Sequence, residues 1–121
     1  KEYTAYEATQ KQRQMETAMR ARREQVQLLR AGGADKEDIT IARCKYQAQL
    51  EQYRSFSKAM GLEEQTDRIY TGRTTGRISP SPQVYAQWQA EQAAKAANRA
   101  KERAEKQRRA AQDAAQKGAS T

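Results

Sequence analysis

Clusters of basic side chains are the residues of this sequence whose types and spacing could do chemistry. Two tetrapeptides are densest in arginine and lysine, 20–23 (Arg-Ala-Arg-Arg) and 106–109 (Lys-Gln-Arg-Arg), and a pair of Thr-Gly-Arg triplets lies between them. Guanidinium and ammonium groups neutralise phosphates without reading base sequence. Any contacts with nucleic acid are therefore expected at Arg20, Arg22, Arg23, Arg73, Arg77, Lys106, Arg108 and Arg109. The commoner role of such clusters is a charged, solvated helix face.

Residues suited to catalysis or metal binding are scarce. The chain has no His and a single Cys, Cys44, so the usual nitrogen and sulfur metal ligands are lacking, as is any Ser–His or Cys–His pair. The carboxylates are scattered among basic residues. We therefore expect a non-enzymatic protein with no metal and no cofactor, in which Cys44 is an inert helix residue. No apolar run approaches the roughly 20 residues that span a bilayer, so no membrane partner is expected.

The composition favours long helices over a compact core of ordinary size. Hydrophobic residues make up 36% of the 121 residues, charged residues 31%, and the net charge is +8. The electrostatic field of such a net positive charge attracts polyanions, either nucleic acid or an acidic protein surface. A solvated basic surface that keeps a chain with few apolar residues in solution would give the same net charge. Both interpretations stay open.

Residues 4–31 predict a first helix. The pattern Thr4-x-x-Glu7 is a capping box, in which side chains satisfy free backbone N–H groups of the first turn. A stripe in steps of four and three residues follows, the heptad spacing that keeps one helix face toward a partner helix. Glycines 32 and 33 should end the helix. The stripe consists of Ala8, Gln12, Met15, Met19, Arg22, Val26 and Leu29.

A second helix is predicted from Asp35 to Met60. Glu37 and Asp38 lie in its first turn, where negative charge offsets the helix dipole, and Gly61 should end it. Its stripe consists of Ile39, Ala42, Tyr46, Leu50, Tyr53, Ser57 and Met60.

Two striped helices joined by a short turn predict an antiparallel helical hairpin and an all-α fold. The large seam side chains are few, and their burial barely offsets the cost of ordering the backbone. We therefore expect the hairpin to need cover from more of its own chain, from further copies, or from another protein. The predicted partner-docking seam consists of Met15, Met19, Val26, Leu29, Ile39, Tyr46, Leu50, Tyr53, Phe56 and Met60.

The rest of the chain predicts three segments. Residues 62–70 could add a short third helix, which would complete a helical region 1–70. Residues 71–82, with their Thr, Gly and Pro, predict an extended linker. Residues 83–121 predict a long, exposed, charged helix rich in Ala, capped by Ser81, stabilised by pairs four residues apart, and frayed at its end.

Two blocks resemble minor head proteins of tailed phages, which are the minor capsid or head-morphogenesis proteins encoded beside the portal. The first block is 6–13 (YEATQKQR), with Met15, Glu16, Arg20 and Arg23 after it. The second block is 52–62 (QYRSFSKAMGL), and it is followed by Gln65, Arg68, Ile69 and Tyr70. Together the blocks span roughly residues 3–72, more than half of the chain.

The resemblance implies a virion component that lies at the portal vertex or inner capsid wall, in few copies, and is assembled in the host cytoplasm. In such proteins a larger N-terminal portion precedes this helical region, so we expect the chain to correspond to a C-terminal part. The expected partners are portal or capsid protein within an oligomeric assembly, with phosphate contacts to packaged genomic DNA as a second role.

The expected function is thus that of a structural minor component of a phage head. Two alternatives remain open. One is a basic helical module that binds nucleic acid without sequence specificity, and the other is a self-associating coiled-coil scaffold.

Overall fold

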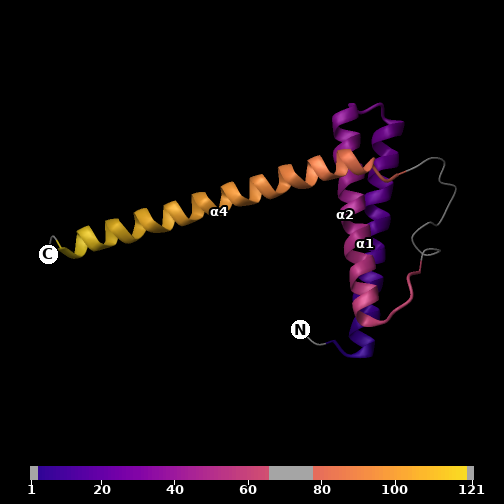
Figure 1. Ribbon diagram of the computed structural model, residues 1–121, viewed down its shortest axis with the longest axis horizontal. Coiled ribbons are helices and arrows are strands. Elements are labelled where there is room, and N and C mark those ends of the chain that lie inside the picture. Colours follow the sequence, from indigo (N-terminus) through magenta and orange to yellow (C-terminus); the bar gives the residue numbers. More distant parts are fainter. Residues whose placement is uncertain (1–2, 66–77, 120–121) are drawn as a thin grey trace. The chain divides into compact units, whose positions relative to one another are not determined.

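The computed structural model describes residues 3–65 and 78–119. They form three helices and no strand: α1 (Ala5–Ala31), α2 (Lys36–Met60) and α4 (Pro82–Ala119). Helices α1 and α2 run antiparallel, side by side, and are joined by a short turn (Figure 1). The predicted all-α fold with a helical hairpin is confirmed.

Local hydrogen bonds fix both ends of α1. Thr4 accepts a bond from the backbone N–H of Glu7 at 3.2 Å and donates its hydroxyl to the Glu7 carboxylate at 2.9 Å. At the other end only Gly33 is left-handed, with φ +70°. The N–H groups of Gly33 and Ala34 bond back to the carbonyls of Arg30 and Leu29. This bonding satisfies carbonyls that a helix end otherwise leaves without partners.

The same arrangement ends α2. Gly61 has φ +67°, its N–H donates to the carbonyl of Lys58, and the N–H of Leu62 donates to the carbonyl of Ser57. Asp35 precedes α2 as predicted, although its side chain makes no capping bond. The turn and the two helix ends therefore follow from the glycine positions.

The core of the hairpin lies where the two predicted stripes meet. Met19 and Val26 of α1 pack with Ala42, Tyr46, Leu50 and Tyr53 of α2. Two residues of α1 depart from the predicted stripe: Arg22, a member of the stripe, is exposed, and Glu16, which lies outside the stripe, is buried. On α2 the structure also buries Cys44, which lies outside the predicted stripe.

Two non-helical segments pack on the hairpin. Residues 62–65, where the sequence predicted the start of a short helix, are not helical, and the remainder of that segment lies outside the described residues. The end of the predicted linker is not a solvated chain, because Ile78 joins the hairpin core and Pro80 is buried. The chain itself therefore supplies part of the cover that the hairpin was expected to need.

The chain divides into two compact units, Lys1–Tyr85 and Ala86–Thr121. The division falls inside α4, since Tyr85 in its first turn is buried and its hydroxyl donates a hydrogen bond to the Glu51 carboxylate of α2. Ser81 caps the start of α4, accepting from the N–H of Val84 at 3.3 Å. In the second unit, the described side chains 93–118 are all exposed.

Candidate docking surfaces

Half of the predicted docking seam is buried within the hairpin itself. Met19, Val26 and Tyr53 have no exposed surface, Tyr46 is 2% exposed and Leu50 is 5% exposed. A side chain without accessible surface cannot touch a partner unless the hairpin opens. The prediction that these five residues form a docking surface is therefore corrected: they hold α1 and α2 together.

The other half of the seam keeps some exposed surface. Met15 and Leu29 pack at the edge of the core, while Ile39, Phe56 and Met60 are half-buried. The Phe56 and Tyr3 rings pack in a T-shaped arrangement, with their centroids 5.6 Å apart. These five residues lie at the margins of the hairpin, where they remain accessible to another protein.

A buried polar cluster closes the open end of the hairpin, the end opposite the turn. Gln12, Glu16 and Ser57 are 3%, 2% and 1% exposed. Gln12 Nε2 donates to Ser57 Oγ at 3.1 Å, and the Tyr53 hydroxyl donates to Glu16 Oε2 at 2.9 Å. Buried polar groups that satisfy one another in this way favour one register of the two helices, because a slip would leave them without partners.

The polar cluster also binds the backbone of the segment after α2. Gln12 Nε2 donates to the carbonyl of Glu63 at 2.8 Å, and the backbone N–H of Gln65 donates to the Tyr53 hydroxyl at 2.7 Å. An exposed ion pair between Arg54 and Glu64, at 3.7 Å, adds to these bonds. The segment 62–65 is thus attached to the hairpin by its main chain.

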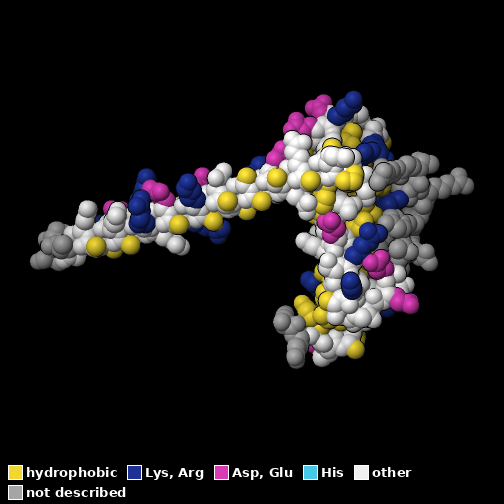
Figure 2. All heavy atoms as spheres, in the orientation of Figure 1, with side chains coloured by type: hydrophobic (Ala, Val, Ile, Leu, Met, Phe, Trp, Pro, Cys, Tyr) yellow, Lys and Arg dark blue, Asp and Glu magenta, His cyan; other side chains and the backbone are white. Residues whose placement is uncertain are grey.

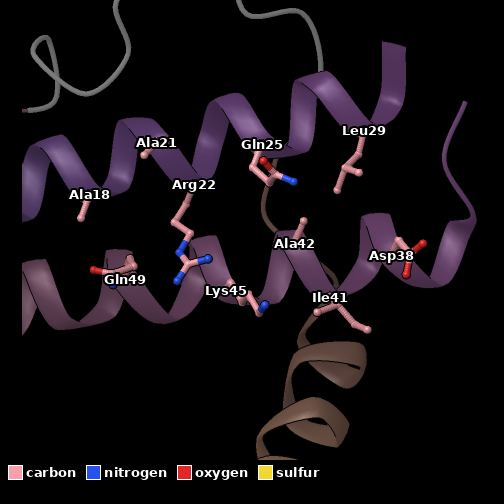
Figure 3. Close-up of a pocket in the computed structure, with 10 residues that line it drawn as sticks. All are labelled: Ala18, Ala21, Arg22, Gln25, Leu29, Asp38, Ile41, Ala42, Lys45 and Gln49. Carbon is pink, nitrogen blue, oxygen red and sulfur yellow. The ribbon is translucent and has the colours of Figure 1, made fainter. Parts of the chain in front are cut away.

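An open groove runs between α1 and α2 toward the turn, and its volume is about 640 Å³ (Figure 3). Its apolar lining comes from Leu29 and Ile41 and from three alanines. Polar side chains border it on both helices. The lining residues are Ala18, Ala21, Arg22, Gln25, Leu29, Asp38, Ile41, Ala42, Lys45 and Gln49.

The charged groups of the groove form no ion pairs within the part of the chain that the structure describes. Arg22 reaches from α1 across the groove toward Lys45 and Gln49 of α2, and Asp38 lies nearer the turn (Figure 3). None of the described residues forms an ion pair with Arg22, Lys45 or Asp38. The groove therefore combines an apolar floor with two exposed cations whose charge nothing in the described chain neutralises.

Sequence reasoning missed the groove as a surface, although a signal for it exists. Residues 18, 22, 25 and 29 recur in steps of four, three and four, and residues 38, 41, 45 and 49 in steps of three, four and four. These are helix-face spacings, and on α1 they share Arg22 and Leu29 with the predicted stripe. Because the residues at these positions are mixed in polarity, hydrophobic periodicity alone does not detect them.

The predicted phosphate contacts fall in several places. Arg22 lies in the groove, whereas Arg20 and Arg23 are half-buried. Arg73 and Arg77 lie outside the described residues. Lys106 is exposed on α4 beside Arg108 and Arg109, which both pair with Glu105, at 3.0 and 3.5 Å.

Basic side chains do not gather into one patch on the face that Figure 2 shows. Lys and Arg alternate with Asp and Glu along α4, with alanines between them, and the same mixture covers the visible face of the hairpin. Exposed pairs of this kind contribute little stability, on the order of 0–1 kcal/mol each. Their effect is to dilute the positive field that a polyanion would meet.

Among the described residues no group of three or more His, Cys, Asp or Glu could hold a metal ion. No described helix is both long enough and apolar enough to span a membrane. Comparisons with protein-family models, curated proteins and solved structures each found no match to this chain.

Proposed function

We propose that this chain is a structural component of a tailed-phage head that docks on portal or capsid protein. The two sequence blocks that resemble minor head proteins are about forty residues apart, yet their side chains meet in the buried polar cluster: Gln12 bonds Ser57, and Glu16 bonds Tyr53. The residues that carry the resemblance are thus the residues that set the helix register. This contact is the observation that carries the proposal.

The exposed surfaces of each unit support a binding role. Its first unit presents an open groove and five accessible seam residues, and its second unit is a long helix whose described side chains from 93 to 118 are exposed. A helix that is polar on all sides stabilises no core, so it is best suited to bridging between bodies. Both units therefore offer surfaces to other components of an assembly.

The test is binding to the portal and capsid proteins encoded with this chain. The full-length chain, labelled with a fluorophore, is expected to sediment with assembled portal rings or capsid shells at near-physiological salt. Loss of co-sedimentation with both assemblies would contradict the proposal. An unrelated helical hairpin of equal net charge serves as the control for nonspecific adhesion.

Nucleic-acid binding is a second candidate, favoured by the basic groups exposed on α4. If Lys106, Arg108 and Arg109 contact phosphates, replacing each with Gln should lower the slope of log K against log salt concentration by about 0.9 per lost contact. An unchanged slope would remove these residues from any DNA interface. The self-associating scaffold has less support, since the seam it would use is half buried in the hairpin.

A further inference from the structure

We propose that the groove between α1 and α2 receives an amphipathic helix with acidic residues from a partner protein. The inference rests on the proposed function in one respect only, that the chain docks on another protein, and it names the surface and the chemistry of that contact. The occupant adds a third helix to the hairpin at the end nearest the turn.

The shape of the groove fits a helix. Two antiparallel helices form its walls. Three of the lining residues are alanines, whose small side chains leave room for the side chains of a partner to enter between the two helices. Leu29 and Ile41 give it apolar contacts near the turn. A helix that lays residues at i, i+3, i+4 and i+7 into such a trough is a recurrent mode of recognition.

The charge of the groove selects the occupant. Arg22 on one wall and Lys45 on the other are exposed and form no ion pair with any described residue. Two Glu or Asp residues on one face of a docked helix would neutralise both cations, and a single one would pair with either of them. Asp38, nearer the turn, favours the positive N-terminal end of the docked helix, so the helix enters with its N-terminus toward the turn.

A second copy of this chain fits less well. A two-fold dimer through the groove would bring together two copies of a patch with two cations and one carboxylate, so two net positive surfaces would meet, because a symmetric interface pairs each patch with itself. The exposed α4 helix of another copy carries eight basic and four acidic residues, a net charge of +4. Like charges therefore oppose both arrangements.

Nucleic acid also fits less well. Phosphates would pair with Arg22 and Lys45, but they would make no favourable contacts with the apolar lining of Leu29, Ile41 and the alanines. The carboxylate of Asp38 would repel them. Affinity for phosphates alone would be sequence-independent and steeply dependent on salt. The apolar floor and the cations together match an acidic amphipathic helix.

The experiment uses the full-length chain and two designed helical peptides with the same leucine stripe, one flanked by Glu and the other by Lys. Calorimetry measures affinity, and amide chemical shifts locate the site. The Glu-flanked peptide should bind roughly tenfold or more tightly than the Lys-flanked one, with shifts at Ala21, Gln25, Ile41 and Gln49. Equal affinities, or shifts that lie elsewhere, would overturn the inference, as would displacement of the peptide by a short DNA duplex at equal concentration.

Three variants make the test specific. Arg22→Glu with Lys45→Glu should reverse the preference between the two peptides. Ala21→Trp should block both peptides by filling the groove without changing its charge. The matched control, Arg13→Glu with Lys58→Glu, makes the same charge change at two exposed positions outside the groove and should keep the wild-type preference. A control that behaves like the groove variant would overturn the inference, because net charge alone would then explain the binding.

The same variants separate this inference from the proposed function. If the Arg22→Glu, Lys45→Glu variant sediments with portal rings or capsid shells as well as the wild type does, the groove inference fails and the proposed function survives. If the wild type binds the Glu-flanked peptide but neither assembly, the proposed function fails and the groove survives.

Discussion

The hydroxyl of Tyr53 donates to Oε2 of Glu16 at 2.9 Å and accepts the N–H of Gln65 at 2.7 Å, so one side chain ties α1, α2 and the following segment together. All of Tyr53 is buried. Replacing it with Phe would leave a buried carboxylate and a backbone N–H without this partner. Losing a hydrogen bond to a buried carboxylate or a buried backbone N–H costs about 1–3 kcal/mol.

The Tyr53→Phe variant should therefore lower the free energy of unfolding by at least about 1 kcal/mol. Urea denaturation followed by far-ultraviolet circular dichroism measures the change. Tyr6→Phe is the matched control, because Tyr6 is 73% exposed and its replacement should have little effect. Equal stability of the two variants would show that the hydrogen bonds of the Tyr53 hydroxyl contribute nothing to stability.

Gly61 ends α2 in the left-handed region, with φ +67°. The Gly61→Ala variant should destabilise the first unit by roughly 1–2 kcal/mol, since an L side chain is strained at this φ. In contrast, Gly118→Ala places a methyl group in open space on α4, without a positive φ, and should increase helix content. Thermal melts of both variants check the prediction, and a neutral Gly61→Ala would contradict the role of the cap.

Tyr85 should make the stability of the first unit sensitive to alkali. Burial, followed by the hydrogen bond to Glu51, raises the pKa of Tyr85 from its usual 10.0 to about 12. A folded-state pKa above the unfolded value contributes stability that is complete below pH 10.0 and is lost as pH rises through about 12. Tyrosinate absorbance should include a late-titrating component that is lost in Tyr85→Phe.

A Tyr85→Phe variant with an unchanged alkaline titration curve would refute this assignment. Denaturant unfolding at several alkaline pH values supplies the second readout, since the wild type should lose stability over that window more steeply than the variant does.

A helix-breaking substitution in the second unit should not change the stability of the first unit. Ala104→Pro interrupts α4 at a cost of about 3 kcal/mol to the helix, and should reduce helical signal. It should leave the unfolding transition of the hairpin unchanged, because Ala104 belongs to the second unit. Ala104→Gln, which keeps the backbone N–H, controls for the change of side chain. A hairpin that melts earlier in Ala104→Pro than in this control would contradict the division.

The hairpin could be predicted because its helices and their ends depend on residues that are close together in the sequence. Heptad spacing placed Met19, Val26, Tyr46 and Tyr53 in the core, and the glycines marked the helix ends. The buried cluster was only partly visible: Gln12 stood out as a polar residue in an apolar stripe, whereas nothing in the sequence distinguished Glu16 from a solvated acid.

Long-range packing was the part that sequence patterns did not reveal. Ile78 lies in a stretch rich in Ser and Pro, which locally favours an extended, solvated chain, yet it packs in the hairpin core. Its burial depends on a surface built by residues more than twenty positions earlier. The expectation that the whole seam awaited a partner was too broad for the same reason, because the hairpin and the segments after it cover half of the seam themselves.

An asymmetric reconstruction of the intact head tests the central claim most directly. The account predicts density for the hairpin at the portal vertex or against the inner capsid wall, with a helix of the neighbouring protein seated along the groove lined by Arg22 and Lys45. Purified particles that lack this chain altogether would contradict the claim.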